Sequence, residues 1–225
     1  MATTPTSPIH KPRAAASPSL SDRAYDAIRG LIVTLGLPPG AVVSERELQE
    51  RLGLGRTPVR EALRDLARDQ LVEVYPRRGI VVSGVDAGDL AELSEVRVML
   101  ESQAARLAAI RREPQDLAET IGLLDELARL PGAHDERQLI ELDQRIHRHV
   151  YRCAHNAFLE ETLERHYVLT LRIWHLALDR VDCLHDAVDE HRELLEAIRD
   201  GEGARAAAVM RAHVVAFERS MRTVL

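Results

Sequence analysis

Residues 44–70, SERELQERLGLGRTPVREALRDLARDQ, predict two helices joined by a tight turn. Ser44 and Glu47 have the S-x-x-E spacing of a capping box, in which each side chain satisfies the backbone N–H of the other residue. Gly53 suits the left-handed backbone conformation that commonly ends a helix. Two short helices with one tight turn between them are typical of a helix-turn-helix, and the rest of the N-terminal part is interpreted from this unit outward.

The second helix of the pair carries arginines where a stable helix would not need them. Thr57 is predicted to cap this helix, with Pro58 at its first position, where a missing N–H does no harm. Arg56 and Arg60 flank the same end, and positive charge there opposes the helix dipole by roughly 0.3–1 kcal/mol per charge. A solvated surface helix is one interpretation. A polyanion at that end would make the arginines favourable, so the whole pattern favours a helix that enters a DNA groove.

The charge of the chain is distributed unevenly between its two parts. Its 225 residues are enough for one large domain or two modest ones. Residues 1–85 carry 12 Lys/Arg and 9 Asp/Glu, a net charge of +3, whereas residues 86–225 carry 18 and 27, a net charge of −9. This asymmetry predicts a DNA-facing N-terminal module and an acidic module that is held away from the phosphates.

Cysteine content and hydropathy predict the cellular compartment in which the protein functions. Cys153 and Cys183 are too few for a disulfide framework, so a reducing cytoplasm is expected. No apolar run approaches the length of a transmembrane helix, and residues 1–20 lack the apolar core of a signal peptide, so no membrane partner is expected. Residues 1–18 are rich in Pro, Ser, Thr and Ala and are predicted to be a disordered leader.

The residues after the helix pair predict a short β-hairpin. A first helix is expected over residues 20–35, followed by a Pro-Pro-Gly turn. Residues 71–82, LVEVYPRRGIVV, predict two strands around a turn at Pro76–Gly79, with Arg78 at the tip. A basic hairpin that follows a helix-turn-helix is the wing of a winged helix. Residues 19–84 are therefore predicted to form a winged helix-turn-helix domain.

The order of these motifs, from the helix and PPG turn through SERELQERLGLGRTPVREALRDLARDQLVEVYPRRGIVV, resembles the DNA-binding domain of the GntR family of bacterial transcription regulators. The resemblance covers roughly residues 19–83. It implies that Arg46, Arg56 and Arg60 contact operator bases or phosphates and that Gly79 lies at the wing. Thr57 and Arg78 join them as further candidate DNA contacts.

Residues 85–225 predict helices only. Six segments have apolar residues at helical spacing, and Pro131-Gly132, His155-Asn156 and Gly201 separate most of them. In the first segment the expected buried stripe consists of Leu93, Val96, Leu100, Ala104 and Leu107. The short connections predict an antiparallel all-α bundle. The fold class is therefore mainly α, with the hairpin as its β element.

Three histidines and one aspartate of the bundle have a spacing that predicts a metal site. Asp143 and His147 are four residues apart and share a helix face with an apolar stripe, and His191 and His213 lie within the stripes of two later helices. Each histidine taken singly is more often a hydrogen-bonded core or surface residue. A divalent ion would satisfy all four groups together, because a lone buried carboxylate is costly. These ligands suit zinc, the preferred candidate, or nickel, manganese or iron.

A second resemblance supports the same residues. Asp-x-x-x-His, then EHRELLEAI, then MRAH resemble the FCD ligand-binding domain of the FadR-type branch of GntR regulators, over roughly residues 86–222. The resemblance implies a metal at the four positions, completed by a small carboxylate effector, and argues against the metal-free acyl-CoA-binding variant. It also implies that Arg97 faces the effector, although a salt bridge to Glu101 is an equal alternative. Tyr167 and Arg172 are further candidates for lining the pocket.

These predictions combine into a functional hypothesis with open alternatives. The protein is expected to be a homodimeric repressor that binds double-stranded operator DNA under the control of a small organic acid. In a metal-sensing repressor the ion itself would be the signal. A metal-dependent enzyme is disfavoured because the sequence shows no convincing general base or nucleophile. A structural DNA-binding protein without an effector is the remaining alternative.

Overall fold

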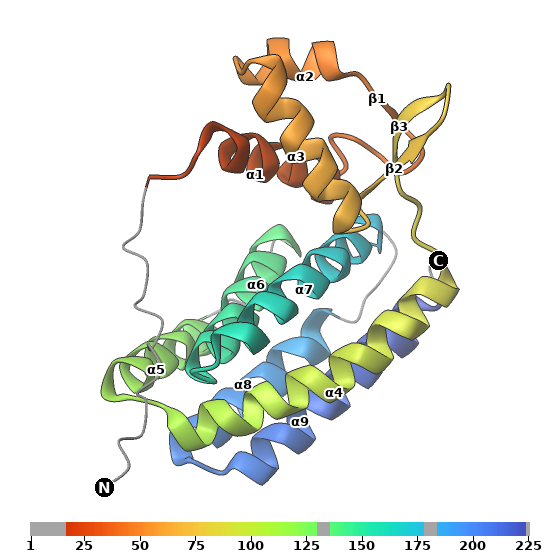
Figure 1. Ribbon diagram of the computed structural model, residues 1–225. Coiled ribbons are helices and arrows are strands. Elements are labelled where there is room, and N and C mark those ends of the chain that lie inside the picture. The colour runs from red at the N-terminus through yellow and green to blue at the C-terminus, as the bar shows by residue number, and fades with distance from the viewer. Residues whose placement is uncertain (1–16, 130–135, 178–183, 224–225) are drawn as a thin grey trace, which may run out of the picture.

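The computed structural model describes residues 17–129, 136–177 and 184–223. The predicted leader therefore lies outside the described residues except for its last two, and Cys183 lies outside them as well. The described chain forms an N-terminal domain of three helices and a small sheet, and a C-terminal bundle of long helices (Figure 1). This arrangement confirms the predicted fold class.

The N-terminal domain packs its helices around one apolar core. Its helices are α1 (Leu20–Val33), α2 (Glu45–Leu52) and α3 (Arg56–Arg68). Ile28 and Ile32 of α1 and Leu63 and Leu66 of α3 are buried in this core, whose apolar contacts continue into the bundle. The same residues recur at helical spacing, so the apolar stripes of α1 and α3 explain why these two helices pack against each other.

The helix ends follow the predicted pattern in part. The Oγ of Ser44 accepts a hydrogen bond of 3.2 Å from the Glu47 amide, but the structure shows no return bond from Glu47 to the Ser44 amide. Gly53 ends α2 at φ 64°, as predicted. The prediction that Thr57 caps α3 is wrong. Gly55 holds the extended N-cap conformation two residues earlier, which places Pro58 at the third position, where its missing N–H is still harmless.

The sheet has three antiparallel strands in the order β1-β3-β2. These strands are β1 (Val42–Val43), β2 (Val72–Tyr75) and β3 (Gly79–Val82). In β2 and β3, Val72 pairs with Val82 and Tyr75 with Gly79, so the predicted hairpin is confirmed. The two-residue strand β1 was not predicted, and it adds to the opposite edge of β3.

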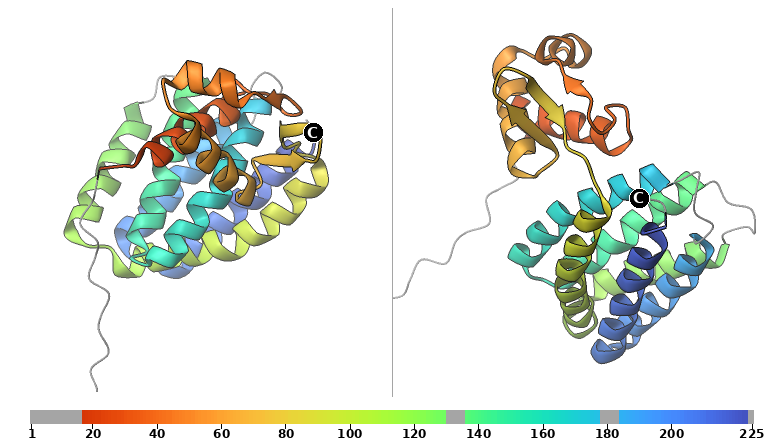
Figure 2. Two further views of the ribbon diagram at one scale, coloured as in Figure 1. Left: turned by 45° about the horizontal axis from the view of Figure 1, so that its top comes forward. Right: turned by 90° about the vertical axis from the view of Figure 1, so that its right-hand side faces the viewer.

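The bundle consists of six helices in the described residues: α4 (Ala87–Arg111), α5 (Pro114–Arg129), α6 (Glu136–Cys153), α7 (Ala157–Ala177), α8 (Leu184–Asp200) and α9 (Gly203–Met221). The most extensive packing is between α4 and α9, which lie side by side along most of their length (Figures 1 and 2). None of the described helices combines the length and the apolar character that crossing a membrane would require.

The buried face of α4 differs from the predicted stripe. Val96, Leu100 and Leu107 are only partly buried. The helix instead turns small side chains such as Ala104, Ala105 and Ala108 into the core, which lets α9 approach closely, and the charged residues Arg97 and Glu101 lie on the same face. The reason is that α4 carries apolar residues on all sides, so periodicity alone does not identify its buried face.

Candidate metal centre and DNA-binding surface

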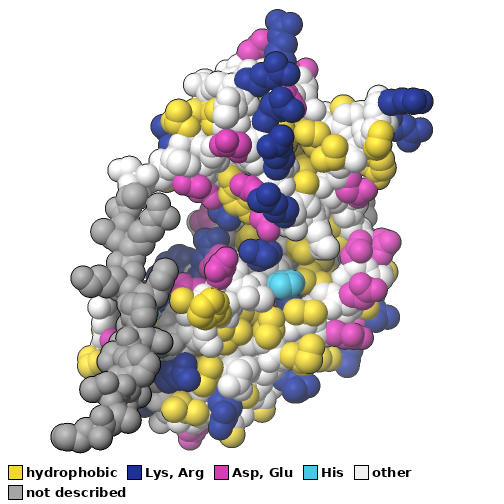
Figure 3. Space-filling model, in the orientation of Figure 1, with side chains coloured by type: hydrophobic (Ala, Val, Ile, Leu, Met, Phe, Trp, Pro, Cys, Tyr) yellow, Lys and Arg dark blue, Asp and Glu magenta, His cyan; other side chains and the backbone are white. Residues whose placement is uncertain are grey.

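The predicted DNA contacts of the helix pair lie on one exposed surface. Arg46 on α2 and Arg56, Thr57 and Arg60 on α3 are all exposed to solvent. In Figure 3 a line of basic side chains runs over the face formed by α2 and α3. Arg46 pairs with Glu50 at 2.9 Å, and the Nε of Arg60 lies 3.8 Å from a carboxylate oxygen of Glu45. These are exposed ion pairs of small net energy, so the arginines remain available to another anion.

The wing carries a second basic surface. Arg78 is exposed in the turn between β2 and β3, and Gly79, which is also exposed, begins β3. Gly79 has φ 87°, a left-handed conformation that a residue with a Cβ adopts only with strain. A separate basic group projects from this end of the domain in Figure 3. The structure thus exposes all six predicted DNA contacts, on the helix pair and at the wing tip.

The four predicted metal ligands meet inside the bundle. Asp143 and His147 come from α6, His191 from α8 and His213 from α9. Each residue offers one ligand atom, and these atoms all lie within 4.8 Å of one another. All four side chains are buried, with exposed fractions between 1% and 6%. Helical spacing alone had predicted this convergence, because each residue lies in the apolar stripe of its helix.

The ligand atoms face one another at short distances, and two of them have no hydrogen-bond partner outside the cluster. The Nε2 atoms of His147 and His213 are 3.2 Å apart, and the Nε2 of His191 lies 3.2 Å from the Oδ1 of Asp143. Apart from this mutual contact, which lacks hydrogen-bond geometry, neither the Asp143 Oδ1 nor the His191 Nε2 has a hydrogen-bond partner. Zinc bonds of about 2.0–2.1 Å in a tetrahedron place neighbouring donor atoms about 3.3 Å apart. The donor set therefore fits a divalent ion.

A second layer of polar residues holds the ligands from behind. The Nδ1 of His147 lies 2.9 Å from a carboxylate oxygen of Glu101, and the Nδ1 of His213 lies 2.8 Å from one of Glu190. The hydroxyl of Tyr167 donates to the Oδ2 of Asp143. Carboxylates behind histidine ligands fix the ring orientation and make the other ring nitrogen a better metal ligand.

The electrostatics of the cluster favour the protonation states that metal binding needs. Burial would raise the pKa of Asp143, but the imidazoles of His147, His191 and His213 hold that pKa well below its usual value. Burial and the neighbouring His191 lower the pKa of His213 to about 4, against the opposing effect of Glu190. At neutral pH Asp143 is therefore an anion and His213 is neutral, and both can donate a lone pair.

The structure brings two of the three candidate effector residues to this cluster. The ring of Tyr167 stacks on His147 at a centroid distance of 4.9 Å. Arg97 is buried and forms the ion pair with Glu101 at 2.5 Å, while its Nη1 has no hydrogen-bond partner. Arg172 does not join them, because its Nη2 donates to the backbone carbonyl of Ser83 in the segment between the domains. The prediction that Arg172 lines the same pocket is therefore not supported by its position.

Glu101 and Glu190 are functional candidates that the sequence did not single out as such. Glu101 was visible only as the partner in a surface salt bridge with Arg97, whereas both side chains are almost fully buried. A signal was present, because Leu93, Arg97 and Glu101 follow one another at four-residue spacing on one helix face. Glu190 directly precedes His191, and no pattern in the sequence marks it.

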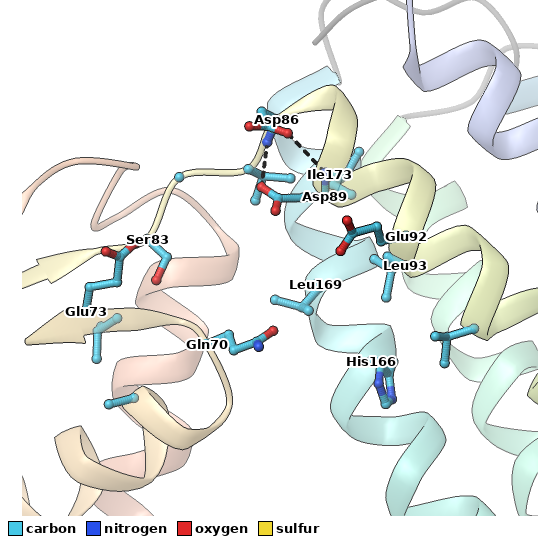
Figure 4. A pocket seen from close by; sticks show the side chains of 15 residues that line it. Gln70, Glu73, Ser83, Asp86, Asp89, Glu92, Leu93, His166, Leu169 and Ile173 are labelled. Atoms are coloured by element: carbon cyan, nitrogen blue, oxygen red, sulfur yellow. Dashed lines mark hydrogen bonds between the residues drawn. The ribbon is translucent and has the colours of Figure 1, made fainter.

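Two large clefts lie at the junction of the domains, away from the cluster. The larger, of about 770 Å³, is bounded by Gln70 and Glu73 of the N-terminal domain, by Ser83–Asp86 and by helices α4 and α7 (Figure 4). The second, of about 630 Å³, separates α1 from α6 and α7. The candidate metal centre is thus enclosed in the bundle, whereas both of these clefts lie between the two domains.

Comparison with known proteins identifies both domains. Residues 20–82 match the model of bacterial regulatory proteins of the gntR family, and residues 92–216 match the FCD domain. The chain belongs to the GntR family of bacterial transcriptional regulators that carry an FCD domain. The earlier resemblance is therefore confirmed, and the N-terminal domain is the helix-turn-helix domain with which GntR regulators bind DNA.

Relatives of this GntR regulator are themselves regulators rather than enzymes. A probable D-xylose utilization operon transcriptional repressor of Paenarthrobacter nicotinovorans is 32% identical over 80% of this chain and 79% of its own. McbR of Escherichia coli is 31% identical over 75% of this chain and 78% of its own. The solved structure of McbR/YncC covers 89% of this chain and 98% of its own, with a TM-score of 0.75 and 28% identity.

A further solved structure shows the fold of the FCD domain by itself. It is described as the metal-free FCD domain of TM0439, with 21% identity and a TM-score of 0.51, and it covers 63% of this chain and 96% of its own. At this identity the likeness concerns the fold alone.

Proposed function

We propose that this GntR regulator is a homodimeric repressor whose affinity for operator DNA depends on a divalent ion held by Asp143, His147, His191 and His213, with a small carboxylate as effector. The observation that carries the proposal is the convergence of four buried ligand atoms, two of which have no other partner. Zinc is the preferred ion, and nickel, manganese or iron fit the same donors.

The bound ion would supply a Lewis-acidic centre for an anionic ligand. Zinc can expand from four to five ligands, and octahedral ions leave two positions beyond the four protein ligands. Arg97 supports a carboxylate ligand, because its Nη1 is buried without a partner and a guanidinium can grip a carboxylate through two nitrogens. Glu101 keeps the same guanidinium in place, because its carboxylate accepts a hydrogen bond from the Nε of Arg97.

One observation favours a second candidate function, that of a metal-sensing repressor. Asp143 and the three histidines already provide the four ligands of a complete tetrahedral zinc shell. In that case the ion alone would change operator affinity. The two functions are separated by titrating operator binding first with Zn²⁺ and then, at saturating Zn²⁺, with a panel of small carboxylates. A further response in the second titration supports the carboxylate-controlled regulator, and a response in the first titration alone supports the metal sensor.

The metal site is tested by replacing one ligand. His191→Ala removes a buried nitrogen donor, so elemental analysis of the purified variant should find almost no bound ion where the wild type holds about one per chain. His155→Asn is the matched control, because His155 is a partly exposed histidine outside the cluster and asparagine tolerates its positive φ. Full metal occupancy in the His191 variant would contradict the site.

The homodimer is proposed because one winged helix contacts one half-site, and a two-fold symmetric pair matches an inverted repeat. Analytical ultracentrifugation measures the mass of the 25.2 kDa chain alone and in complex with a duplex that the protein selects from a randomised pool. The mass gives the number of chains in each species. A single chain on the selected duplex would contradict the dimer.

A further inference from the structure

Helix α7 is the part of the bundle that supports the N-terminal domain. Helix α1 packs on α7, and no other pair of a described N-terminal element and a bundle helix has comparable contact. Figure 2 shows the N-terminal domain above the bundle, joined to it by the segment that leads into α4. The position of α7 therefore sets the orientation of the N-terminal domain.

The two clefts lie on either side of this contact. Leu169 and Ile173 of α7 line the larger cleft, and Val168 and Leu171 of the same helix line the smaller one. Figure 4 shows Leu169 of α7 extending towards Gln70 across the larger cleft. Because neither flank of the contact is filled, the N-terminal domain has room to tilt about α7. An interface of this kind permits domain motion, unlike a large apolar one.

Two arginines attach the N-terminal domain to α7 along the ridge between the clefts. The Nε of Arg165 lies 3.2 Å from the Oδ1 of Asp69, the residue that ends the DNA-facing helix α3. The other carboxylate oxygen of Asp69 accepts a hydrogen bond of 2.6 Å from Tyr25 on α1. The buried guanidinium of Arg172 donates to the carbonyl of Ser83. Arg165 and Arg172 thus connect α7 to two places in the N-terminal domain, the end of α3 at Asp69 and the residue that follows β3, Ser83.

Tyr167 lies on the opposite face of the same helix. At about 100° per residue, Arg165 and Arg172 are about two turns apart and share a face, whereas Tyr167 is rotated by about 200° from Arg165. This face points to the metal centre, where the Tyr167 hydroxyl donates to Asp143 and its ring stacks on His147. One rigid helix therefore contacts a candidate metal ligand on one side and the N-terminal domain on the other.

We propose that Tyr167, Arg165 and Arg172 are positioning residues that couple the metal centre to the orientation of the DNA-binding domain through α7. The inference rests on the proposed metal-dependent function. A bound ion would hold the Oδ1 of Asp143, so the Oδ2 and the hydroxyl of Tyr167 adopt one fixed arrangement. Arg165 and Arg172 then transfer the position of α7 to α3 and to the segment at Ser83. The coupling requires that the ion favours one of two domain orientations.

The test measures operator affinity by fluorescence anisotropy with and without saturating Zn²⁺, on a duplex that the wild type selects from a randomised pool. Zn²⁺ is expected to change the wild-type dissociation constant by a factor between about 5 and about 150. In Arg165→Gln and Tyr167→Phe this factor should fall towards 1. Arg165 is more than half exposed and phenylalanine keeps the buried ring, so both variants should fold.

A matched control separates coupling from a general loss of charge. Arg205→Gln removes another half-exposed arginine that is ion-paired, with Glu202 at 3.0 Å, but in the first turn of α9, and that end of α9 lies far from the N-terminal domain (Figure 1). Its Zn²⁺ factor should equal that of the wild type. Tyr167→Phe is expected to bind Zn²⁺ up to about 10–100-fold more weakly, and Arg165→Gln with unchanged affinity. A purely structural role of Arg165 would lower the unfolding midpoint without changing the Zn²⁺ factor.

Three outcomes would overturn the inference, and they are distinguishable. If the wild type retains no Zn²⁺, or binds it without any change in operator affinity, the proposed metal-dependent function fails and the inference fails with it. If the wild type is coupled but both variants keep the full factor, only the role of α7 is wrong. In support of the inference, operator DNA should raise or lower the wild-type affinity for Zn²⁺ by the same factor, because coupling is reciprocal.

Discussion

The N-terminal domain exposes its candidate functional residues, whereas the bundle buries them. Arg46, Arg56 and Arg60 lie on the surface of one helix pair, and they form at most weak ion pairs with neighbouring glutamates. Asp143 and its three histidines come from three helices and are enclosed with a second layer of charged residues. A substitution in the first group should therefore change DNA binding alone, whereas one in or behind the second group should change folding stability as well.

The largest expected effect comes from the buried ion pair behind His147. Glu101→Gln keeps the volume of the side chain but leaves the buried Arg97 guanidinium without an anion. We expect a loss of about 3–5 kcal/mol in the free energy of unfolding, because removing one partner of a buried pair strands the other charge. Urea unfolding followed by circular dichroism measures it. The double variant Arg97→Met/Glu101→Leu should lose much less, and an equal loss in both would contradict the explanation.

The same pair predicts a dependence on pH. Burial would raise the pKa of Glu101, but Arg97 and His147 lower it from its ordinary value of 4.5 to about 2. A depressed carboxyl pKa stabilises the fold above the unfolded-state pKa, and this contribution is lost as the pH falls from about 4.5 through about 2. The stability difference between the wild type and Glu101→Gln should therefore shrink over that range. A difference that stays constant down to pH 2 would exclude an ionised Glu101.

The second largest effect tests whether the two domains unfold separately. Leu63→Ala opens a cavity in the core of the N-terminal domain and should cost about 2–5 kcal/mol. The single tryptophan, Trp174, is buried in the bundle, so its fluorescence reports on the bundle alone. In Leu63→Ala we expect the transition measured by circular dichroism to begin at a lower urea concentration than in the wild type. The transition measured by Trp174 fluorescence should stay at the wild-type urea concentration. Leu195→Ala in the bundle should move the Trp174 signal instead, and coincident shifts in both variants would show a single cooperative unit.

The third largest effect is a loss of affinity for DNA with no change in the free energy of unfolding. Arg60→Ala should weaken binding to the selected duplex by about 1–3 kcal/mol if Arg60 contacts a base, and the free energy of unfolding should be unchanged within about 0.5 kcal/mol. Anisotropy titrations at fixed salt measure the affinity. Arg68→Ala, at the far end of α3 and paired with Asp65, is the matched control with a smaller expected effect. Equal losses in both variants would indicate a general electrostatic contribution rather than a base contact.

The same contrast explains what the sequence predicts well. The helix pair and the hairpin are specified by neighbours in the chain, so Gly53 and the Pro76–Gly79 turn were placed correctly. The convergence of Asp143 and the histidines followed from helical stripes that must all face one core. Strand β1 escaped prediction because two residues, Val42 and Val43, give no alternation, and their pairing with β3 depends on a distant segment.

The second layer of the candidate metal centre escaped prediction for a different reason. Glu101 and Glu190 meet their histidines across helix contacts, and sequence spacing specifies a helix face but not which helix lies opposite. The predicted buried face of α4 was wrong for the same reason, since its alanines and its partly buried leucines occupy different faces of one apolar helix. Arg172 was misplaced because its helix face meets the connection at Ser83 rather than the metal centre.

The smallest expected effect separates the sequence motif from the observed helix cap. The S-x-x-E motif predicts that both Ser44 and Glu47 stabilise α2, whereas the structure forms only the bond from the Glu47 amide to the Ser44 hydroxyl. Ser44→Ala should therefore cost about 1 kcal/mol in the free energy of unfolding of the N-terminal domain. Glu47→Gln should cost less than about 0.5 kcal/mol, since it removes no observed bond and only a charge near the helix N-terminus. Urea unfolding of both variants measures the two losses side by side. Equal losses would mean that the full capping box forms in solution, and that the local motif, rather than the observed half-cap, describes how α2 is held in place.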